Sequence, residues 1–243
     1  MSSEHISNDS TAGIQPAVAL SEVVRHFGRF AAVRGVTANF VPGRLYVVLG
    51  ENGAGKSTLL RMMAGLLQPT RGTIRILGET DIRSMAPRMG YMGHAPLLYD
   101  ELDAMENLRY FAGLYSIHDD RACAAAIERV GLDPGLKRRV GQYSQGMRQR
   151  ASLARAILHN PELILLDEPF SNVDVRSAHA MARLLGAMRD EGKTVFVVTH
   201  QAAVVEPVAD ESIVMHTGRL VAREHGIPHS LLSPYSQPSE VRR

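Results

Sequence analysis

The strongest constraint on the fold of this chain is a nine-residue stretch at positions 50–58, with the sequence GENGAGKST. It matches the pattern G-x-x-x-x-G-K-[ST] at every required position. The apolar run at residues 45–49 precedes it and predicts a buried parallel strand. Apolar residues at helical spacing follow it, namely Leu59, Leu60, Met63, Leu66 and Leu67. A strand, a glycine-rich turn and a helix in this order are the structural context that the pattern requires.

The residue types in this stretch suit the binding of a triphosphate. Glycines let the backbone wrap closely around phosphate groups, so that successive N–H groups point inward, and the helix starting near Gly55 adds its positive end. Lys56 can reach the β- and γ-phosphates, and the Ser57 hydroxyl is placed to bind Mg²⁺. The alternative is a glycine turn with an incidental Lys-Ser pair. The predicted nucleoside triphosphate site comprises Gly50, Glu51, Asn52, Gly53, Ala54, Gly55, Lys56, Ser57 and Thr58.

Composition limits the class of protein and its partners. A chain of 243 residues can bury a sizeable core, as one domain or as a domain with a subdomain. The net charge of +2 is close to neutral, so no nucleic-acid partner is expected. A single cysteine excludes an intramolecular disulfide framework and fits a reducing cytosol. No stretch approaches the ~20 apolar residues of a membrane span, and residues 1–15 lack the apolar segment of a secretion signal. We therefore expect a cytoplasmic chain that takes any membrane role from a partner.

Apolar periodicity predicts a sheet-rich region on either side of a helical one. Predicted strands cover residues 17–24 and 36–41 (a hairpin with a turn at 27–30), 73–78, 163–166, 194–198, and a last hairpin at 212–216 and 219–222. Predicted helices cover residues 105–115, 120–130, 145–158 and about 177–188, and no strand is expected between 95 and 158. The expected organisation is a flexible leader (1–16), one domain (17–225) with a core (17–94 and 159–225) and a helical subdomain (95–158), and a flexible tail (226–243).

Two carboxylates follow the apolar run at residues 163–166. A buried strand would place Asp167 and Glu168 at its carboxyl end, where open α/β sheets bind their ligands. Asp167 can hold Mg²⁺ directly or through water, and Glu168 can orient or deprotonate an attacking water. The alternative is an acidic helix N-terminus, since Pro169 follows.

Two further stretches have both a chemical and a structural interpretation. His200 follows the predicted strand 194–198, where it can contact the γ-phosphate and hold Glu168 and the water in register, although a lone histidine is usually structural. Ser144 precedes the predicted helix 145–158 and is a natural N-cap. A helix N-terminus containing a glycine can also bind phosphate, but the cap is the default interpretation.

In combination, these stretches resemble the ATP-binding cassette (ABC) family of transporter ATPases. Residues 50–57 resemble its Walker A motif, 163–168 its Walker B motif with the catalytic glutamate, and 171–174 its D-loop. Residues 143–147 are similar to its LSGGQ signature, and His200 to its switch histidine. Phe27 lies 29 positions before Lys56, where the family places the aromatic residue that stacks on adenine; the alternative is a core residue of the first hairpin. The resemblance covers about residues 17–225.

The resemblance implies a fold and a set of ligands and partners. The implied fold is α/β: a P-loop NTPase core of the ABC ATPase type with an antiparallel β subdomain and a helical insertion. The implied ligands are ATP and Mg²⁺. Two copies would pair head to tail, so that each ATP lies between residues 50–57 of one copy and residues 144–147 of the other, including Ser144 and Gly146. Asp174, in the D-loop, is a further implied nucleotide contact. A separate membrane permease would be moved through the helical insertion, and the ATPase would be peripheral on the inner face of the cell membrane, powering export.

The sequence also departs from the family pattern. Tyr143, Gln145 and Met147 replace the usual Leu, Gly and Gln of the signature, while Ser144 and Gly146 remain. His94 stands where the family normally has Gln, so it is a candidate catalytic residue or metal ligand that faces the attacking water or Mg²⁺, unless it only packs at the subdomain hinge.

The substrate stays open at this stage. The sequence from residue 91 to 108 resembles the ATPase of haem exporters in cytochrome c maturation. The alternatives are the ATPase of a two-component (ABC-2 type) drug, lipid or polysaccharide exporter, a soluble cassette ATPase acting on nucleic acid or ribosomes, and a P-loop kinase.

Overall fold

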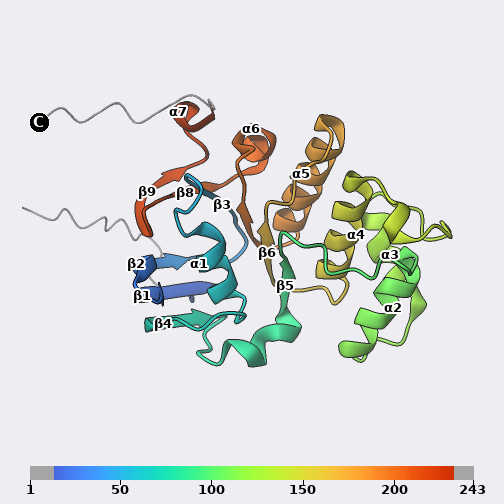
Figure 1. The fold of residues 1–243 in the computed structure, drawn as a ribbon, viewed down its shortest axis with the longest axis horizontal. Helices are drawn as coiled ribbons and strands as arrows, with labels where there is room; N and C mark the ends of the chain where they lie inside the picture. The colour runs from blue at the N-terminus through green and yellow to red at the C-terminus, as the bar shows by residue number, and fades with distance from the viewer. Residues whose placement is uncertain (1–13, 233–243) are drawn as a thin grey trace, which may run out of the picture.

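The computed structural model describes residues 14–232, which form two sheets and a helical end (Figure 1). The smaller sheet is antiparallel, with strand order β2-β1-β4, and the larger one has the order β5-β6-β7-β3-β8-β9. The strands of the smaller sheet are β1 (Val18–Phe27), β2 (Phe30–Phe40) and β4 (Arg71–Ile76). Those of the larger sheet are β3 (Leu45–Leu49), β5 (Met89–Met92), β6 (Leu163–Asp167), β7 (Thr194–Val198), β8 (Glu211–His216) and β9 (Arg219–His225).

The three central strands of the larger sheet are parallel and fully buried. In β3, β6 and β7 every residue is buried, as expected for parallel strands that are covered on both faces. Val47 pairs with Val197, and Leu165 with Phe196, so the carboxyl ends of the three strands lie at one edge. The loops that follow these strands therefore meet at that edge.

Helices cover both faces of the larger sheet. On one face, α1 (Lys56–Met63) and the smaller sheet enclose one apolar cluster, which includes Tyr46 and Val48 of β3. On the other face, Leu45 and Val47 of β3 join a second cluster with the remaining long helices. These are α2 (Ala104–Leu114), α3 (Asp120–Arg129), α4 (Gln145–Ile157) and α5 (Val175–Asp190). Successive side chains of β3 point to opposite faces of the sheet, so this one strand contributes to both apolar clusters.

The helical end matches the prediction for residues 95–158. It holds α2, α3, α4 and a 3₁₀ turn (Val140–Gln142), and no strand occurs in this described segment. The three helices lie at the end of the molecule opposite the smaller sheet (Figure 1). The shorter elements elsewhere are a 3₁₀ helix (Ile82–Arg88), α6 (Ala202–Val205), a 3₁₀ turn (Glu206–Val208) and α7 (His229–Leu232).

Two strand predictions differ from the structure. The first hairpin is longer than predicted, because β1 and β2 pair as far as Phe27 and Phe30, and only Gly28 and Arg29 remain in the turn. Strand β5 was not predicted, since four residues that include Gly90 are too short to show a strand period. It forms because it pairs in parallel with β6 at the edge of the sheet.

The predicted ends of two elements also need correction. Helix α1 stops at Met63 because Gly65 takes the left-handed φ of +70° and closes the helix, so Leu66 is exposed rather than on an apolar helix face. The prediction of a flexible tail from residue 226 is wrong for residues 226–232, where Ile227 is buried in the helical core cluster and α7 follows. The predicted leader falls largely outside the described residues, as does the tail beyond residue 232.

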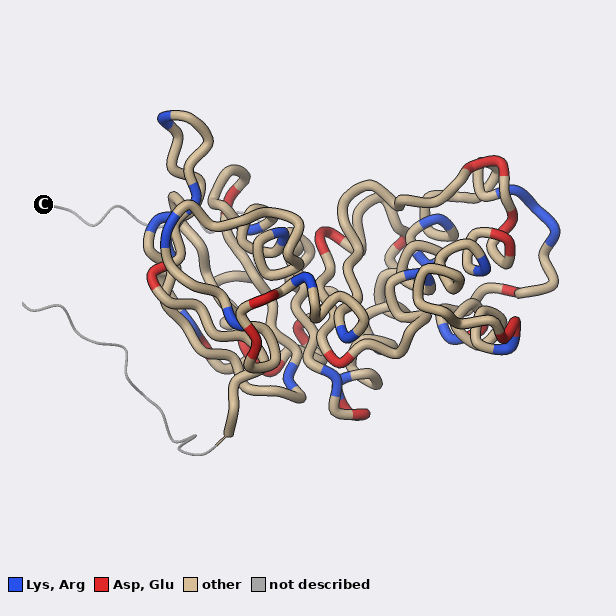
Figure 2. The backbone as a smooth tube through the Cα atoms, turned by 90° about the horizontal axis from the view of Figure 1, so that it is seen from below, with Lys and Arg blue, Asp and Glu red and all other residues tan. Residues whose placement is uncertain are grey.

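Within residues 14–232, no helix has both the length and the apolar character needed to cross a bilayer. Figure 2 shows that basic and acidic residues are dispersed along the backbone at both ends of the molecule.

Candidate functional site

A cavity of about 450 Å³ opens beside the glycine-rich turn, at the edge where the parallel strands end. Its walls come from the β1–β2 hairpin, the turn before α1, and the loops after β5, β6 and β7. The lining residues are Phe27, Phe30, Ala32, Asn52, Gly53, Ala54, Gly55, Lys56, Ser57, Thr58, His94, Glu168, Ser171 and His200. Five segments that are distant in sequence therefore meet at one place, and they carry all three predicted catalytic side chains.

The turn before α1 has the shape of an open cradle. Gly55 has a φ of +97°, and a Cβ at this position would lie 2.4 Å from the Ala32 carbonyl oxygen, so a larger residue does not fit. At Gly53, with a φ of +80°, a Cβ would meet nothing within 4 Å and would occupy the open space of the cradle. Gly55 is therefore required for close packing against Ala32, and Gly53 for a left-handed turn that leaves room for a ligand.

Lys56 is held at the base of this cradle. Its ammonium donates to the carbonyls of Gly50 at 2.7 Å and Glu51 at 2.9 Å, and the residue is buried. Burial lowers the pKa of Lys56, while the carboxylates of Glu168 and Asp167 oppose that shift. Because an ammonium has three donors, one remains for an anionic ligand in the cavity. Gly50 and Glu51 accept these hydrogen bonds from Lys56, and they do not line the cavity.

Ser57 and Asp167 meet below the cavity. The Ser57 hydroxyl donates to Asp167 Oδ1 at 2.8 Å, and Asp167 is buried at the end of β6. Hydroxyl and carboxylate oxygens are suitable ligands for Mg²⁺, which usually takes one or two protein ligands and completes its shell with phosphate and water oxygens. Among the described residues, no group of three or more His, Cys, Asp and Glu side chains could hold a metal ion alone. The pair thus fits a magnesium ion that depends on a bound phosphate.

Glu168 and His200 form a pair on the cavity wall. His200 Nε2 lies 3.3 Å from Glu168 Oε1, and the His200 backbone N–H donates to Glu168 Oε2 at 3.3 Å. Burial raises the pKa of the Glu168 carboxyl, and the neighbouring His200 acts in the opposite direction. Glu168 also has the left-handed φ of +54°. A half-buried carboxylate next to an imidazole can accept a proton from water in the cavity.

The two aromatic residues at the hairpin turn stand at the mouth of the cavity. Phe27 is 47% exposed, which contradicts the alternative that it is a core residue, and the Arg25 guanidinium lies 4.7 Å from its ring centre. Phe30, its register partner across the turn, is also exposed. The sequence pattern did not lead us to predict that Phe30 lines the cavity. Phe30 is separated from Phe27 by only the two turn residues, so a hairpin that places Phe27 at the cavity also brings Phe30 there.

A second group of predicted nucleotide contacts lies away from the cavity. Ser144 caps α4 by accepting from the Met147 N–H at 3.2 Å, and Asp174 caps α5 by accepting from the Ser177 N–H at 2.9 Å. A Cβ on Gly146 would lie 3.9 Å from Asp174 Oδ2, so the two helix starts are adjacent. None of Ser144, Gly146 and Asp174 lines the cavity. Within one chain, the cap interpretation of Ser144 is confirmed.

Comparison with known proteins agrees with this geometry. Residues 33–171, more than half of the chain, match a family model described as ABC transporter. This chain belongs to the ABC transporter family of ATP-binding subunits. The predicted α/β ABC ATPase fold is thereby confirmed, as is the predicted enzyme class, an ATPase whose hydrolysis of ATP is coupled to transport.

Individual relatives of this ABC ATPase have different names. The Bacillus subtilis (strain 168) ABC transporter ATP-binding protein NatA is 37% identical over 199 residues, which are 79% of this chain and 81% of the relative. The Nod factor export ATP-binding protein I of Burkholderia lata is 33% identical over 216 residues, which are 86% of this chain and 70% of the relative. Neither name gives support to the predicted haem specificity.

A solved structure has the same architecture. It is a dimeric structure of the ATP-binding cassette MJ0796 in a post-hydrolysis state, bound to ADP and Pi. The two chains superpose with a TM-score of 0.78 and are 25% identical, and the match covers 86% of this chain and 98% of the other.

Proposed function

We propose that this ABC ATPase powers export through a separate membrane permease, and that two copies bind ATP between them. The observation that carries the proposal is the division of the predicted contacts into two groups. One group lines the cavity and comprises the proposed phosphate contacts and the hydrolytic side chains. The other group, Ser144, Gly146 and Asp174, does not line the cavity. In a head-to-tail pair, the second group of one copy faces the cavity of the other. The dimeric cassette MJ0796, bound to ADP and Pi, supports this arrangement.

In the proposed site, each phosphate contact has a defined source. Backbone N–H groups of the turn and the free donor of Lys56 bind the β- and γ-phosphates. Ser57 and Asp167 would hold Mg²⁺, which neutralises charge on the phosphate oxygens when it is bound. Phe27 offers the ring face opposite Arg25 for stacking on adenine.

Glu168 is the proposed base for hydrolysis. It accepts a proton as the water oxygen bonds to the γ-phosphorus, and the bond between that phosphorus and the β–γ bridging oxygen breaks. His200 holds the carboxylate from two sides, through its ring and its backbone N–H. His94, which lines the same cavity from the loop after β5, is proposed to orient the water or to face the magnesium site.

A mixing experiment tests the shared site. Lys56→Ala removes a cavity contact, and Gly146→Asp places a negative charge at the second group, where the structure has room for a side chain. Each variant alone should lack ATPase activity. In a head-to-tail pair of one copy of each, one of the two sites has both an intact Lys56 and an intact Gly146, so mixing the two inactive proteins should restore part of the activity. No recovery on mixing, together with a loss of activity for each variant, would contradict the shared site.

The permease is proposed to dock on the helical end. Four large apolar side chains are exposed there, on α2 and on the loop that leads to it from His94; they are Leu97, Tyr99, Tyr110 and Leu114. Tyr99 and Tyr110 contact each other edge to face at 5.0 Å, and Leu114 follows Tyr110 by one helical turn. Exposed apolar patches of this kind mark interaction sites. A membrane partner at this patch would place the subunit on the inner face of the membrane.

Co-purification of the tagged chain with a membrane protein tests the docking surface. Leu114→Glu should abolish the capture, whereas Leu66→Glu should not, because Leu66 is similarly exposed (63% against 67%) but lies after α1. If both variants captured the membrane protein equally well, the helical end would be excluded as the docking site.

The relative named for Nod factor export supports the direction of transport. For the cargo, the resemblance across residues 91–108 is the sole support for haem, so haem is one candidate among exported compounds. Stimulation of ATPase activity by haem in vesicles that contain the captured permease would test it.

A further inference from the structure

The loop between β5 and α2 carries His94 into the nucleotide cavity, and it contains a strained residue. Leu97 has a φ of +52°, in the left-handed region that a side chain with a Cβ rarely adopts. It is also exposed, so its own side chain does not hold it there. Strain of this kind persists only where neighbouring contacts determine the backbone. The contacts that hold this loop therefore also determine where His94 lies.

Helix α4 holds the loop on both sides of His94. The Ser152 hydroxyl donates to the Pro96 carbonyl at 3.0 Å, and the Arg155 guanidinium donates to the Tyr91 carbonyl at 2.9 Å. Residues 152 and 155 are one turn apart, so both donors come from one face of the helix. Ser152 is completely buried, which shields its hydrogen bond from water.

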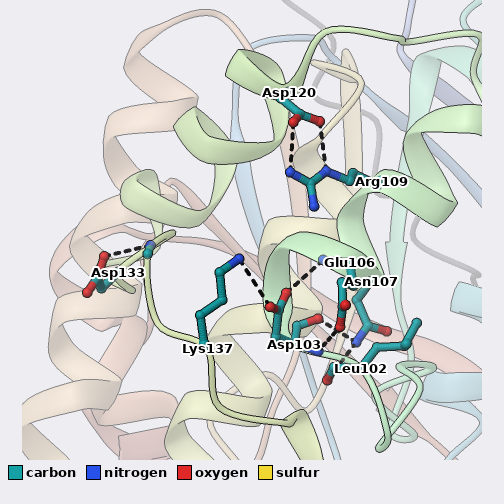
Figure 3. A network of polar contacts seen from close by, with 9 residues as sticks. Leu102, Asp103, Glu106, Asn107, Arg109, Asp120, Asp133 and Lys137 are labelled. Atoms are coloured by element: carbon teal, nitrogen blue, oxygen red, sulfur yellow. Dashed lines mark hydrogen bonds and ion pairs between the residues drawn. The ribbon is translucent and has the colours of Figure 1, made fainter.

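Helix α2 supplies the third anchor. The side chain of Asn107, also completely buried, accepts from the Tyr99 N–H at 2.8 Å and donates to the Tyr99 carbonyl at 3.0 Å. Figure 3 shows this asparagine within the polar network at the start of α2, beside Asp103 and Glu106. The loop is thus fixed at residues 96 and 99, and the strand before it is fixed at residue 91. His94 itself makes no hydrogen bond or ion pair among residues 14–232 and lines the cavity.

We propose that Ser152 is a positioning residue for ATP hydrolysis, because it fixes the carbonyl two residues after His94 and next to the strained Leu97. Arg155 and Asn107 hold the flanks of the loop, and Ser152 holds its centre. The same helix is capped at its N-terminus by Ser144, so α4 connects the proposed partner-facing group to the wall of its own cavity. The inference rests on the proposed function in one respect, the assignment of His94 to the hydrolytic site.

The first measurement compares kcat with nucleotide binding. Ser152→Ala should lower kcat by roughly 3- to 10-fold, the effect of one lost hydrogen bond, and should leave KM for ATP and the affinity for a fluorescent ATP analogue unchanged. Binding is unaffected because the phosphate cradle has no contact with Ser152. Ser212→Ala is the matched control, since Ser212 is equally buried but its hydroxyl has no hydrogen-bond partner among residues 14–232; the kcat of this variant should stay at the wild-type value. Ser152→Thr, which retains the hydroxyl, should recover activity.

The second measurement is a double-mutant cycle with His94→Ala. If Ser152 acts through His94, the double variant should have the same kcat as His94→Ala alone. Independent, multiplying losses would overturn the positioning role and leave the proposed role of His94 intact. An unchanged kcat for Ser152→Ala beside a reduced kcat for His94→Ala would do the same. An unchanged kcat for His94→Ala would overturn both the inference and the proposed role of His94, while the mixing experiment would still test the shared site.

Discussion

Glu168 shows how one residue combines backbone strain, burial and charge. Its backbone is left-handed directly after β6, burial raises the pKa of its carboxyl, and His200 contacts that carboxylate. A base that is partly desolvated accepts a proton more readily than an exposed carboxylate. Glu168→Gln keeps the shape and removes this capacity. We expect a loss of ATPase activity of at least about 100-fold with ATP affinity preserved, and ATP should then hold the variant as a dimer in size-exclusion chromatography.

The control for this variant is Glu162→Gln. Glu162 precedes β6 and forms an ion pair with Arg88 at the surface, away from the cavity. Its loss should leave turnover near the wild-type value. Wild-type turnover in Glu168→Gln would exclude Glu168 as the base.

At the scale of the element, α2 depends on its first turn. Asp103 accepts from the Glu106 N–H and Glu106 accepts from the Asp103 N–H, both at 2.8 Å, which is a complete capping box (Figure 3). Lys137 contacts the same buried carboxylate at 3.4 Å. Asp103→Ala should lower the free energy of unfolding by about 1–2 kcal/mol in urea titrations, because it removes a cap and leaves a helix N–H unpaired.

Asp119→Ala is the matched control for the cap. Asp119 caps α3 through the Arg121 N–H at 2.9 Å, but it is exposed, so water can replace it at a smaller cost. A larger loss for Asp119→Ala than for Asp103→Ala would contradict the importance that we give to the α2 start.

At the scale of the whole molecule, His159 joins the helical end to the larger sheet. Its ring stacks on Tyr115 at 4.0 Å, and its Nε2 lies 2.9 Å from the Met89 carbonyl of β5. Burial lowers the pKa of His159 below the usual 6.5; the hydrogen bond with the Met89 carbonyl opposes that shift, and the nearby Arg155 adds to it. The unfolded chain therefore binds this proton at a higher pH than the folded chain. The resulting stability is present above the ordinary histidine pKa and is lost as the pH falls below it, by at most about 1.4 kcal/mol per pH unit.

This linkage gives a measurable pH dependence. The wild-type free energy of unfolding should decline between neutral pH and about pH 5.5, and His159→Phe, which keeps a ring beside Tyr115 but has no titratable nitrogen, should decline less. His118→Phe is the control at an exposed histidine and should follow the wild-type slope. Parallel curves for wild type and His159→Phe would exclude His159 as a source of the decline.

Several elements were predictable because their signals are local. The strand, glycine-rich turn and helix at residues 45–63 and the apolar run before Asp167 follow from periodicity and residue type alone. The cap Ser144 stands where its helix begins. Strand β5 was not predictable, because its pairing with β6 rather than its own pattern makes it a strand. Ile227 is buried because it packs against the apolar cluster that contains the helices α2 to α5. Its own neighbours in the sequence are mainly polar residues and prolines, so the local pattern gives no sign of this burial.

The sequence by itself determined the type of chemistry, since Lys56, Ser57, Asp167 and Glu168 occur in patterns that few other sites use. Only the tertiary structure decided which of these residues act together. It placed Phe27, His94, Glu168 and His200 around one cavity and placed Ser144 and Asp174 away from it. It also connected the His94 loop to α4 through Ser152. The physical reason is that strand pairing and helix packing gain their free energy from contacts between distant segments, and no local pattern of residues records which segments those are.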